Sequence, residues 1–206
     1  MEYKDYISTF EKYAERDHRE IHFQNEIVKP FLRSVLPELF VEDVHSYFNK
    51  GGHHDFSQYA GETSEYISSQ PDLVICDNWH TENKISKENT ENEVKKVNYN
   101  AIVEVKSPFL EPIFHLDPLN YLDTANTVKE SGLREKAKDL LRPMKVKKLI
   151  FTDTLKWEFY YISDEGIIVK TIQLHNNEKN PFKSRAWTWR NEEAYEELKR
   201  FVRGFI

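Results

Sequence analysis

The chain has 206 residues, a formal net charge of −6 and an apolar content of 39%. This length and composition suit one compact domain with its own core, so we expect a single domain over residues 1–206. The single cysteine, Cys76, excludes a disulfide framework within the chain and is typical of a reducing cytoplasm. The charged N-terminal residues do not resemble a secretory signal, and no apolar run approaches the roughly 20 residues that a membrane span needs. We therefore expect a cytoplasmic protein without a membrane partner.

The N-terminal third is predicted to be helical, with a first helix over about 3–15. A second helix follows from a stripe of apolar residues at helical spacing, namely Ile27, Val28, Phe31, Leu32, Val35 and Leu36. Pro30 lies inside this stripe, and because an interior proline costs about 3 kcal/mol we expect a kink near it. Glu26 lies on the flank of the stripe rather than on its solvent side, so we expect it to approach the edge of a sheet.

The middle of the chain is predicted to contain two central strands, at 73–76 and 101–105. Both runs are short and apolar on both sides of the strand alternation, which is typical of strands covered by helices on both faces. The polar segment between them, at about 78–100, indicates a flexible hairpin connection.

The C-terminal half is predicted to begin with a basic helix over about 126–144, followed by a strand at 148–151. A hairpin at 157–162 and 166–174 comes next, and an amphipathic helix capped by Asn191 covers about 191–206. This order predicts an α/β domain of three layers (αβα), with a central mixed sheet of four to five strands flanked by helices.

Three charged residues stand at the ends of the two central strands. Asp72 opens the first strand, and Glu104 and Lys106 end the second. Residues two apart on a strand point to the same face, so Glu104 and Lys106 should lie together, with Val103 and Val105 turned into the core. If the two strands form an antiparallel hairpin, Asp72 lies beside Glu104. The alternatives are a turn aspartate after Pro71 and an ordinary cross-strand ion pair.

Two carboxylates at the edge of an apolar sheet are costly unless they are paired or bind a metal ion. The carboxylates of Asp72 and Glu104 and the carbonyl of Val105 are hard oxygen ligands that suit Mg²⁺. Lys106 would position or deprotonate a metal-activated water and offset charge on phosphorus. Glu26 would hold a metal-bound water or a second ion, or else be an exposed helix carboxylate. The sequence therefore predicts a catalytic trio of Asp72, Glu104 and Lys106 at a magnesium site.

The motif Pro71-Asp72 followed by Glu104-Val105-Lys106 resembles the signature of the PD-(D/E)XK, or restriction-endonuclease-like, superfamily. The helix at 25–32 is similar to the first helix of that fold, whose glutamate assists metal binding. The segments at 149–153 and 157–160 resemble late strands of the nuclease domains in type I restriction subunits and their stand-alone relatives. Spanning about 20–162, the resemblance implies Mg²⁺ or Mn²⁺ dependence and an endonuclease that hydrolyses DNA in restriction, defence or mobile-element biology.

DNA is the expected partner, with RNA as an alternative that leaves the site unchanged. Basic residues on the helix after the lysine either follow a phosphate backbone or form a solvated face: Lys129, Arg134, Lys136, Lys138 and Arg142. A homodimer or a separate partner subunit is compatible with such an enzyme. The acidic net charge motivates a rival hypothesis, a catalytically silent nuclease-like fold that binds nucleic acid or a protein.

Overall fold

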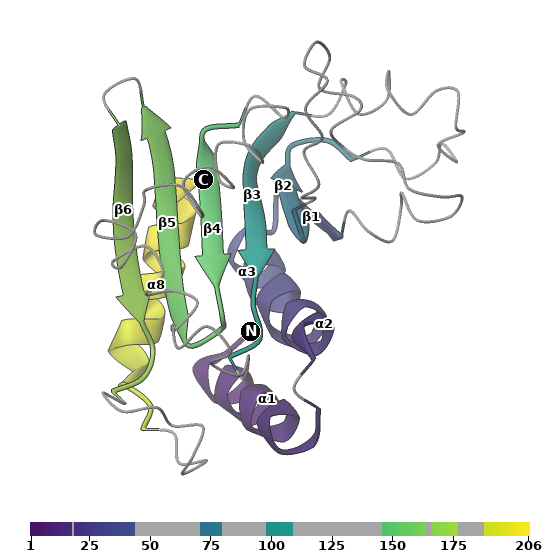
Figure 1. Cartoon of the computed structure of the whole chain (residues 1–206), viewed down its shortest axis with the longest axis vertical. Helices are drawn as coiled ribbons and strands as arrows, with labels where there is room; N and C mark the ends of the chain where they lie inside the picture. The colour runs from purple at the N-terminus through teal and green to yellow at the C-terminus, as the bar shows by residue number, and fades with distance from the viewer. Residues whose placement is uncertain (18, 44–70, 80–97, 109–145, 164–165, 177–187) are drawn as a thin grey trace, which may run out of the picture.

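A mixed six-stranded sheet forms the centre of the protein, an α/β architecture (Figure 1). The computed structural model describes residues 1–17, 19–43, 71–79, 98–108, 146–163, 166–176 and 188–206. Neighbouring strands follow chain order, and every pair is antiparallel except β3 and β4, which run parallel. The strands are β1 (Phe40–Asp43), β2 (Leu73–Cys76), β3 (Tyr99–Val105), β4 (Lys148–Thr152), β5 (Lys156–Ser163) and β6 (Gly166–Gln173).

The sheet has one strand more than expected, so the prediction of four to five strands is wrong. The additional strand is β1, which pairs antiparallel with β2 at the edge of the sheet. Its four residues, Phe-Val-Glu-Asp, include two acids, and only Val41 and Asp43 are buried. A run this short and this polar lacks the apolar alternation from which strands are predicted. The five predicted strands are confirmed to within two residues at either end.

The helices within the described residues pack on one face of the sheet. They are α1 (Tyr3–Arg16), α2 (Glu20–Phe23), α3 (Lys29–Val35) and α8 (Glu192–Phe205), and α8 lies behind β5 and β6 in Figure 1. One core cluster joins them. The centroid of the Phe31 ring lies 5.0 Å from the ring centroid of Trp157 on β5 and 5.6 Å from that of Tyr195 on α8. None of these helices is long and apolar enough to cross a membrane.

The opposite face of the sheet carries the alternate residues of the same strands. Val74, Ile102 and Leu149 are buried there, in register with one another across β2, β3 and β4, and Phe151 is buried beside Glu104. The basic helix predicted at 126–144, which would supply a second helical layer, lies outside the described residues. The same holds for residues 80–97 of the predicted hairpin connection.

The second predicted helix is interrupted by a π-helical turn. Residues 20–35 form α2, the π turn η1 (Gln24–Val28) and α3 in direct succession. This wider turn ends two residues before Pro30, and the kink expected near the proline stays a prediction. A proline removes one backbone donor and its ring crowds the preceding turn, which a π turn relieves by taking in one extra residue. The apolar stripe itself is buried as predicted.

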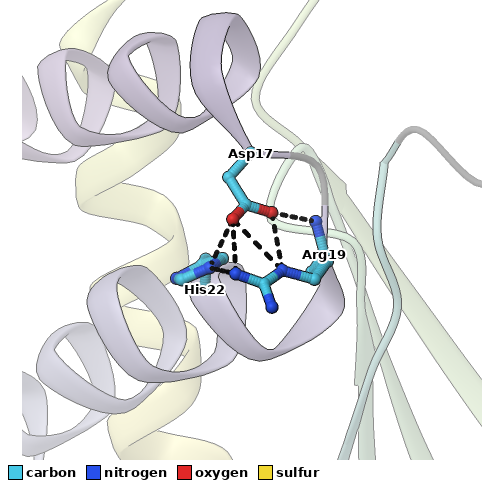
Figure 2. A network of polar contacts seen from close by, with 3 residues as sticks. All are labelled: Asp17, Arg19 and His22. Carbon is cyan, nitrogen blue, oxygen red and sulfur yellow. Dashed lines mark hydrogen bonds and ion pairs between the residues drawn. The ribbon is translucent and has the colours of Figure 1, made fainter.

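The corner between α1 and α2 is held by a charged network around Asp17 (Figure 2). Arg19 donates to the Asp17 carboxylate through its backbone N–H at 3.1 Å and through Nη2 at 2.6 Å. His22 Nε2 lies 2.8 Å from the same carboxylate, and its ring stacks on Tyr13. These hydrogen bonds and the charge of Arg19 lower the pKa of Asp17 well below its usual range. The network therefore fixes the first turn of α2, in which Glu20 lies.

Candidate functional site

Asp72 is attached to β3 at both its backbone and its side chain. Its N–H donates to the carbonyl of Val103 at 3.1 Å, and its Oδ2 accepts from the N–H of Val105 at 2.7 Å. The carboxylate thus takes over a hydrogen bond that the strand ladder would otherwise supply. Gln24 donates from Nε2 to the Asp72 carbonyl at 3.4 Å, which links the π turn to the same position. The predicted antiparallel pairing of the two central strands is confirmed.

Glu104 and Lys106 lie on one face of β3, as strand alternation predicts. Val103 and Val105 point into the core on the other face. Glu104 is 3% exposed, so its carboxylate lies within the fold and not on a solvated strand end. The N–H of Lys106 donates to the carbonyl of Thr152 at 2.8 Å, which extends the parallel pairing of β3 with β4. The backbone of Lys106 is therefore fixed by the sheet, whereas its long side chain can change conformation.

The ammonium of Lys106 lies at the centre of the charged residues. Its Nζ is 2.8 Å from Glu104 Oε1 and 2.7 Å from the carbonyl oxygen of Val105. Asp72 Oδ2 lies at 4.0 Å, and Glu20 Oε2, from the first turn of α2, lies at 3.4 Å. We call Glu20, Asp72, Glu104 and Lys106 the site cluster. Three carboxylates therefore surround one ammonium at the junction of β2, β3 and α2.

The electrostatics of the site cluster reflect this excess of negative charge. Burial, followed by the charge of Glu104, raises the pKa of Asp72 to about 7, although Lys106 and the Val105 N–H act in the opposite direction. For Lys106, burial lowers the pKa, but Glu104, Asp72 and Glu20 together outweigh it, and the net change is upward. The lysine is therefore charged at neutral pH. Asp72 would ionise fully there only if more positive charge came close.

The structure brings Glu20 to the site, whereas Glu26 is exposed. Glu26 lies seven residues before Arg33, and both are on the solvent side of the helix. Glu20 and Gln24 are four residues apart and face the strands instead, with Gln24 buried. Sequence reasoning missed both residues. The available signal was a polar Gln24 between the apolar residues Phe23 and Ile27, because a buried amide needs a partner.

The oxygens of the site fit a hard divalent cation. Asp72, Glu104 and the Val105 carbonyl are the ligand set predicted from the sequence. The Lys106 ammonium lies within 4.0 Å of an oxygen of each of them. Within the described part of the chain, no group of three or more His, Cys, Asp or Glu side chains is arranged to hold a metal. The candidate set instead combines two carboxylates with a backbone carbonyl.

A second group of buried polar residues lies on the same face of the sheet. Lys156 Nζ pairs with Glu158 Oε1 at 3.0 Å, and the Tyr160 hydroxyl donates to Glu158 Oε2. We call these three residues of β5 the β5 cluster. Strand register places Glu104, Phe151 and Glu158 in one row, so the two clusters are about two strand spacings, or roughly 10 Å, apart.

The basic residues predicted to contact nucleic acid all lie outside the described residues: Lys129, Arg134, Lys136, Lys138 and Arg142. Comparison with protein-family models found no matching model for this chain, and comparisons with curated proteins and with solved structures found no match either. The fold and the site cluster are therefore the observations on which a functional proposal rests.

Proposed function

We propose that this protein is a metal-dependent endonuclease of the PD-(D/E)XK type, with Asp72, Glu104 and Lys106 as its catalytic residues. The observation that carries the proposal is the convergence of these three side chains at one point, although Asp72 lies 32 or more residues before the other two in the chain. A mixed sheet with the acidic residues on adjacent antiparallel strands is compatible with a restriction-endonuclease-like fold.

Asp72, Glu104 and the carbonyl of Val105 would hold a Mg²⁺ or Mn²⁺ ion. The chemistry that such an ion supplies is neutralisation of charge on a phosphate and a lower pKa of a bound water. Asp72 is ready for this role because its Oδ2 is already oriented by the Val105 N–H. Glu104 contributes a carboxylate that the sheet holds in a fixed position. Both side chains are shielded from bulk water, which strengthens their interaction with a cation.

Lys106 would act on the substrate side of this site. Its ammonium would donate to a non-bridging phosphate oxygen or to the attacking water, and so offset negative charge in the transition state. Its elevated pKa favours the charged form, which suits electrostatic stabilisation better than proton abstraction. We propose DNA as the substrate, in a restriction, defence or mobile-element setting, with RNA as the alternative substrate.

A catalytically silent fold that binds nucleic acid or a protein is the second candidate. The observation that favours it is the Lys106 ammonium, which already satisfies the oxygens that a metal would need. The net charge of −6 favours the protein-binding form of this candidate over the nucleic-acid-binding form, because a nucleic-acid-binding surface is usually basic.

A cleavage assay separates the two candidates. Supercoiled plasmid, linear duplex, single-stranded DNA and RNA would be incubated with Mg²⁺, Mn²⁺ or EDTA, using wild type, Asp72→Ala, Glu104→Ala and Lys106→Ala. Glu193→Ala is the matched control, because this exposed carboxylate lies on α8, across the sheet from the site. Metal-dependent cleavage lost in all three site variants supports the nuclease. Wild type without activity on any substrate favours the silent fold, and activity retained in any site variant refutes the assigned roles.

A further inference from the structure

We propose that the Lys106 ammonium and a divalent cation occupy the same oxygens in turn, and that Glu20 receives the ammonium when the cation enters. This inference rests on the metal dependence proposed above. It makes Lys106 a placeholder in the metal-free protein and Glu20 a positioning residue, which acts on the site through the lysine.

The first observation is that the ammonium and the metal would need the same atoms. Lys106 Nζ contacts Glu104 Oε1 at 2.8 Å and the Val105 carbonyl at 2.7 Å, with Asp72 Oδ2 at 4.0 Å. These are two carboxylates and a carbonyl, the hard oxygen donors that Mg²⁺ prefers. Two positive charges a few ångströms apart repel strongly where water is scarce. A cation can therefore bind only if the ammonium moves away from these three oxygens.

The second observation is the imbalance of charge. Three carboxylates around one ammonium leave two formal negative charges when all four groups are ionised. A divalent cation that entered while Lys106 stayed within the cluster would neutralise this excess. If the metal instead displaced the lysine from the cluster altogether, a negative charge would remain. The charge count therefore favours a lysine that moves within the cluster over one that leaves it.

The third observation concerns where the ammonium would go. Glu20 Oε2 is already 3.4 Å from Lys106 Nζ, so a small rotation of the flexible lysine stem would exchange one carboxylate for another. The Glu20 side chain is 36% exposed, whereas that of Glu104 is 4% exposed, so Glu20 lies on the open side of the cluster. The network at Asp17 holds the turn that carries Glu20 in place.

The test is a double-mutant cycle on metal affinity. Isothermal titration with Mn²⁺ would compare wild type, Lys106→Met, Glu20→Gln and the double variant. Removal of the competing ammonium should tighten Mn²⁺ binding by about tenfold or more. Glu20→Gln should weaken binding several-fold in wild type, because the displaced ammonium loses its acceptor. In the Lys106→Met background the same substitution should change nothing.

Two results would overturn the inference. Mn²⁺ affinity that stays equal or falls in Lys106→Met shows that the ammonium does not compete. An equal loss from Glu20→Gln in both backgrounds makes Glu20 a direct metal ligand rather than an acceptor for Lys106. Glu15→Gln, an exposed carboxylate near the end of α1, is the control and should leave affinity unchanged. If Lys106→Met does not fold, Lys106→Thr carries the same expectation.

Plasmid cleavage by wild type, measured in parallel, separates this inference from the proposed function. Cleavage with an unchanged affinity in Lys106→Met would refute the exchange alone. If wild type neither cleaves nor binds Mn²⁺ while Lys106→Met binds it, the ammonium blocks the site permanently, and both the exchange and the nuclease proposal fail. Absence of Mn²⁺ binding in every variant would refute both.

Discussion

Glu104 and Lys106 of the site cluster lie on the same face of the sheet as the β5 cluster, yet the two clusters differ in charge balance and in exposure. In the β5 cluster, one ammonium meets one carboxylate, and both oxygens of Glu158 have a partner within the cluster. The side chains of Lys156 and Glu158 are 9% and 4% exposed, so that pair is closed to solvent. In the site cluster, three carboxylates share one ammonium, and Lys106 and Glu20 reach 22% and 36% exposure.

This difference is the one expected between a structural ion pair and the proposed metal site. A buried pair that is balanced and hydrogen-bonded needs no further ligand, although breaking it leaves an uncompensated charge. A cluster with excess charge and one open side is incomplete, and its carboxylates are stabilised when another cation arrives. Burial of charge alone would not have distinguished the two clusters, because Glu104 and Glu158 are each only 3% exposed.

The largest expected effect comes from matched Glu→Gln substitutions in the two clusters. Glu104→Gln should reduce metal-dependent cleavage by about 100-fold or more, because it replaces a charged ligand with a neutral one. Glu158→Gln should leave the cleavage rate per folded molecule within about threefold of wild type, since Glu158 lies about 10 Å away from Glu104. Initial rates on plasmid, corrected for the folded fraction, measure both. Equal losses would mean that the β5 cluster also belongs to the active site.

The next effect is on stability and should rank the clusters in the opposite order. Lys156→Met should lower the free energy of unfolding by about 3–5 kcal/mol, because Glu158 keeps its charge in a closed environment. Lys106→Met should lower the free energy of unfolding by less, because solvent reaches the site cluster on the side where Glu20 is exposed. Urea denaturation in EDTA gives both values. Added Mn²⁺ should then restore stability to Lys106→Met but not to Lys156→Met, and restoration of both or of neither would contradict the comparison.

A pH-dependent effect is expected from Asp72 alone. Its pKa is raised from an ordinary 3.8 to about 7, so the folded state binds more protons than the unfolded state between these values. The stability gained from the proton is fully present below about pH 4 and is lost as the pH rises through 7. Asp72→Asn removes this titration. Its free energy of unfolding should therefore rise relative to that of wild type between pH 5 and pH 8, by at most about 4 kcal/mol.

Denaturation curves without metal at pH 5, 6.5 and 8 would measure this gain. A constant difference between Asp72→Asn and wild type across the three pH values would show that Asp72 does not titrate in this window.

The smallest effect is expected at the corner of α1 and α2. Asp17→Asn weakens the contacts of Arg19 and His22 with the carboxylate, but all three side chains are at least partly exposed, so thermal stability should change little. The informative readout is metal affinity, which should fall less than in Glu20→Gln because the helix still carries Glu20. A larger loss in Asp17→Asn would assign the corner a direct role.

The strand-borne part of the site could be predicted from the sequence, and the helix-borne part could not. Alternation along β3 placed Glu104 with Lys106, and antiparallel pairing placed Asp72 beside Glu104, because a strand has a fixed period and register. The helical carboxylate was placed at Glu26, on the flank of the apolar stripe, whereas the structure exposes Glu26 and brings Glu20 to the site cluster. The π turn changes the helical phase within that stripe, and a local widening of this kind has no dependable signature in one sequence.

The π turn also gives this helix a property that a regular helix lacks. The extra residue in Gln24–Val28 acts as a phase shift between two rigid segments, one anchored to the α1 corner and the other to the core. If the same residues wound as a regular α-helix, Glu20 would turn by about 100° relative to α3, whereas deleting the extra residue would leave its direction nearly unchanged. The wide turn is therefore itself a determinant of the site, because it sets the direction of Glu20 while every charged residue is retained.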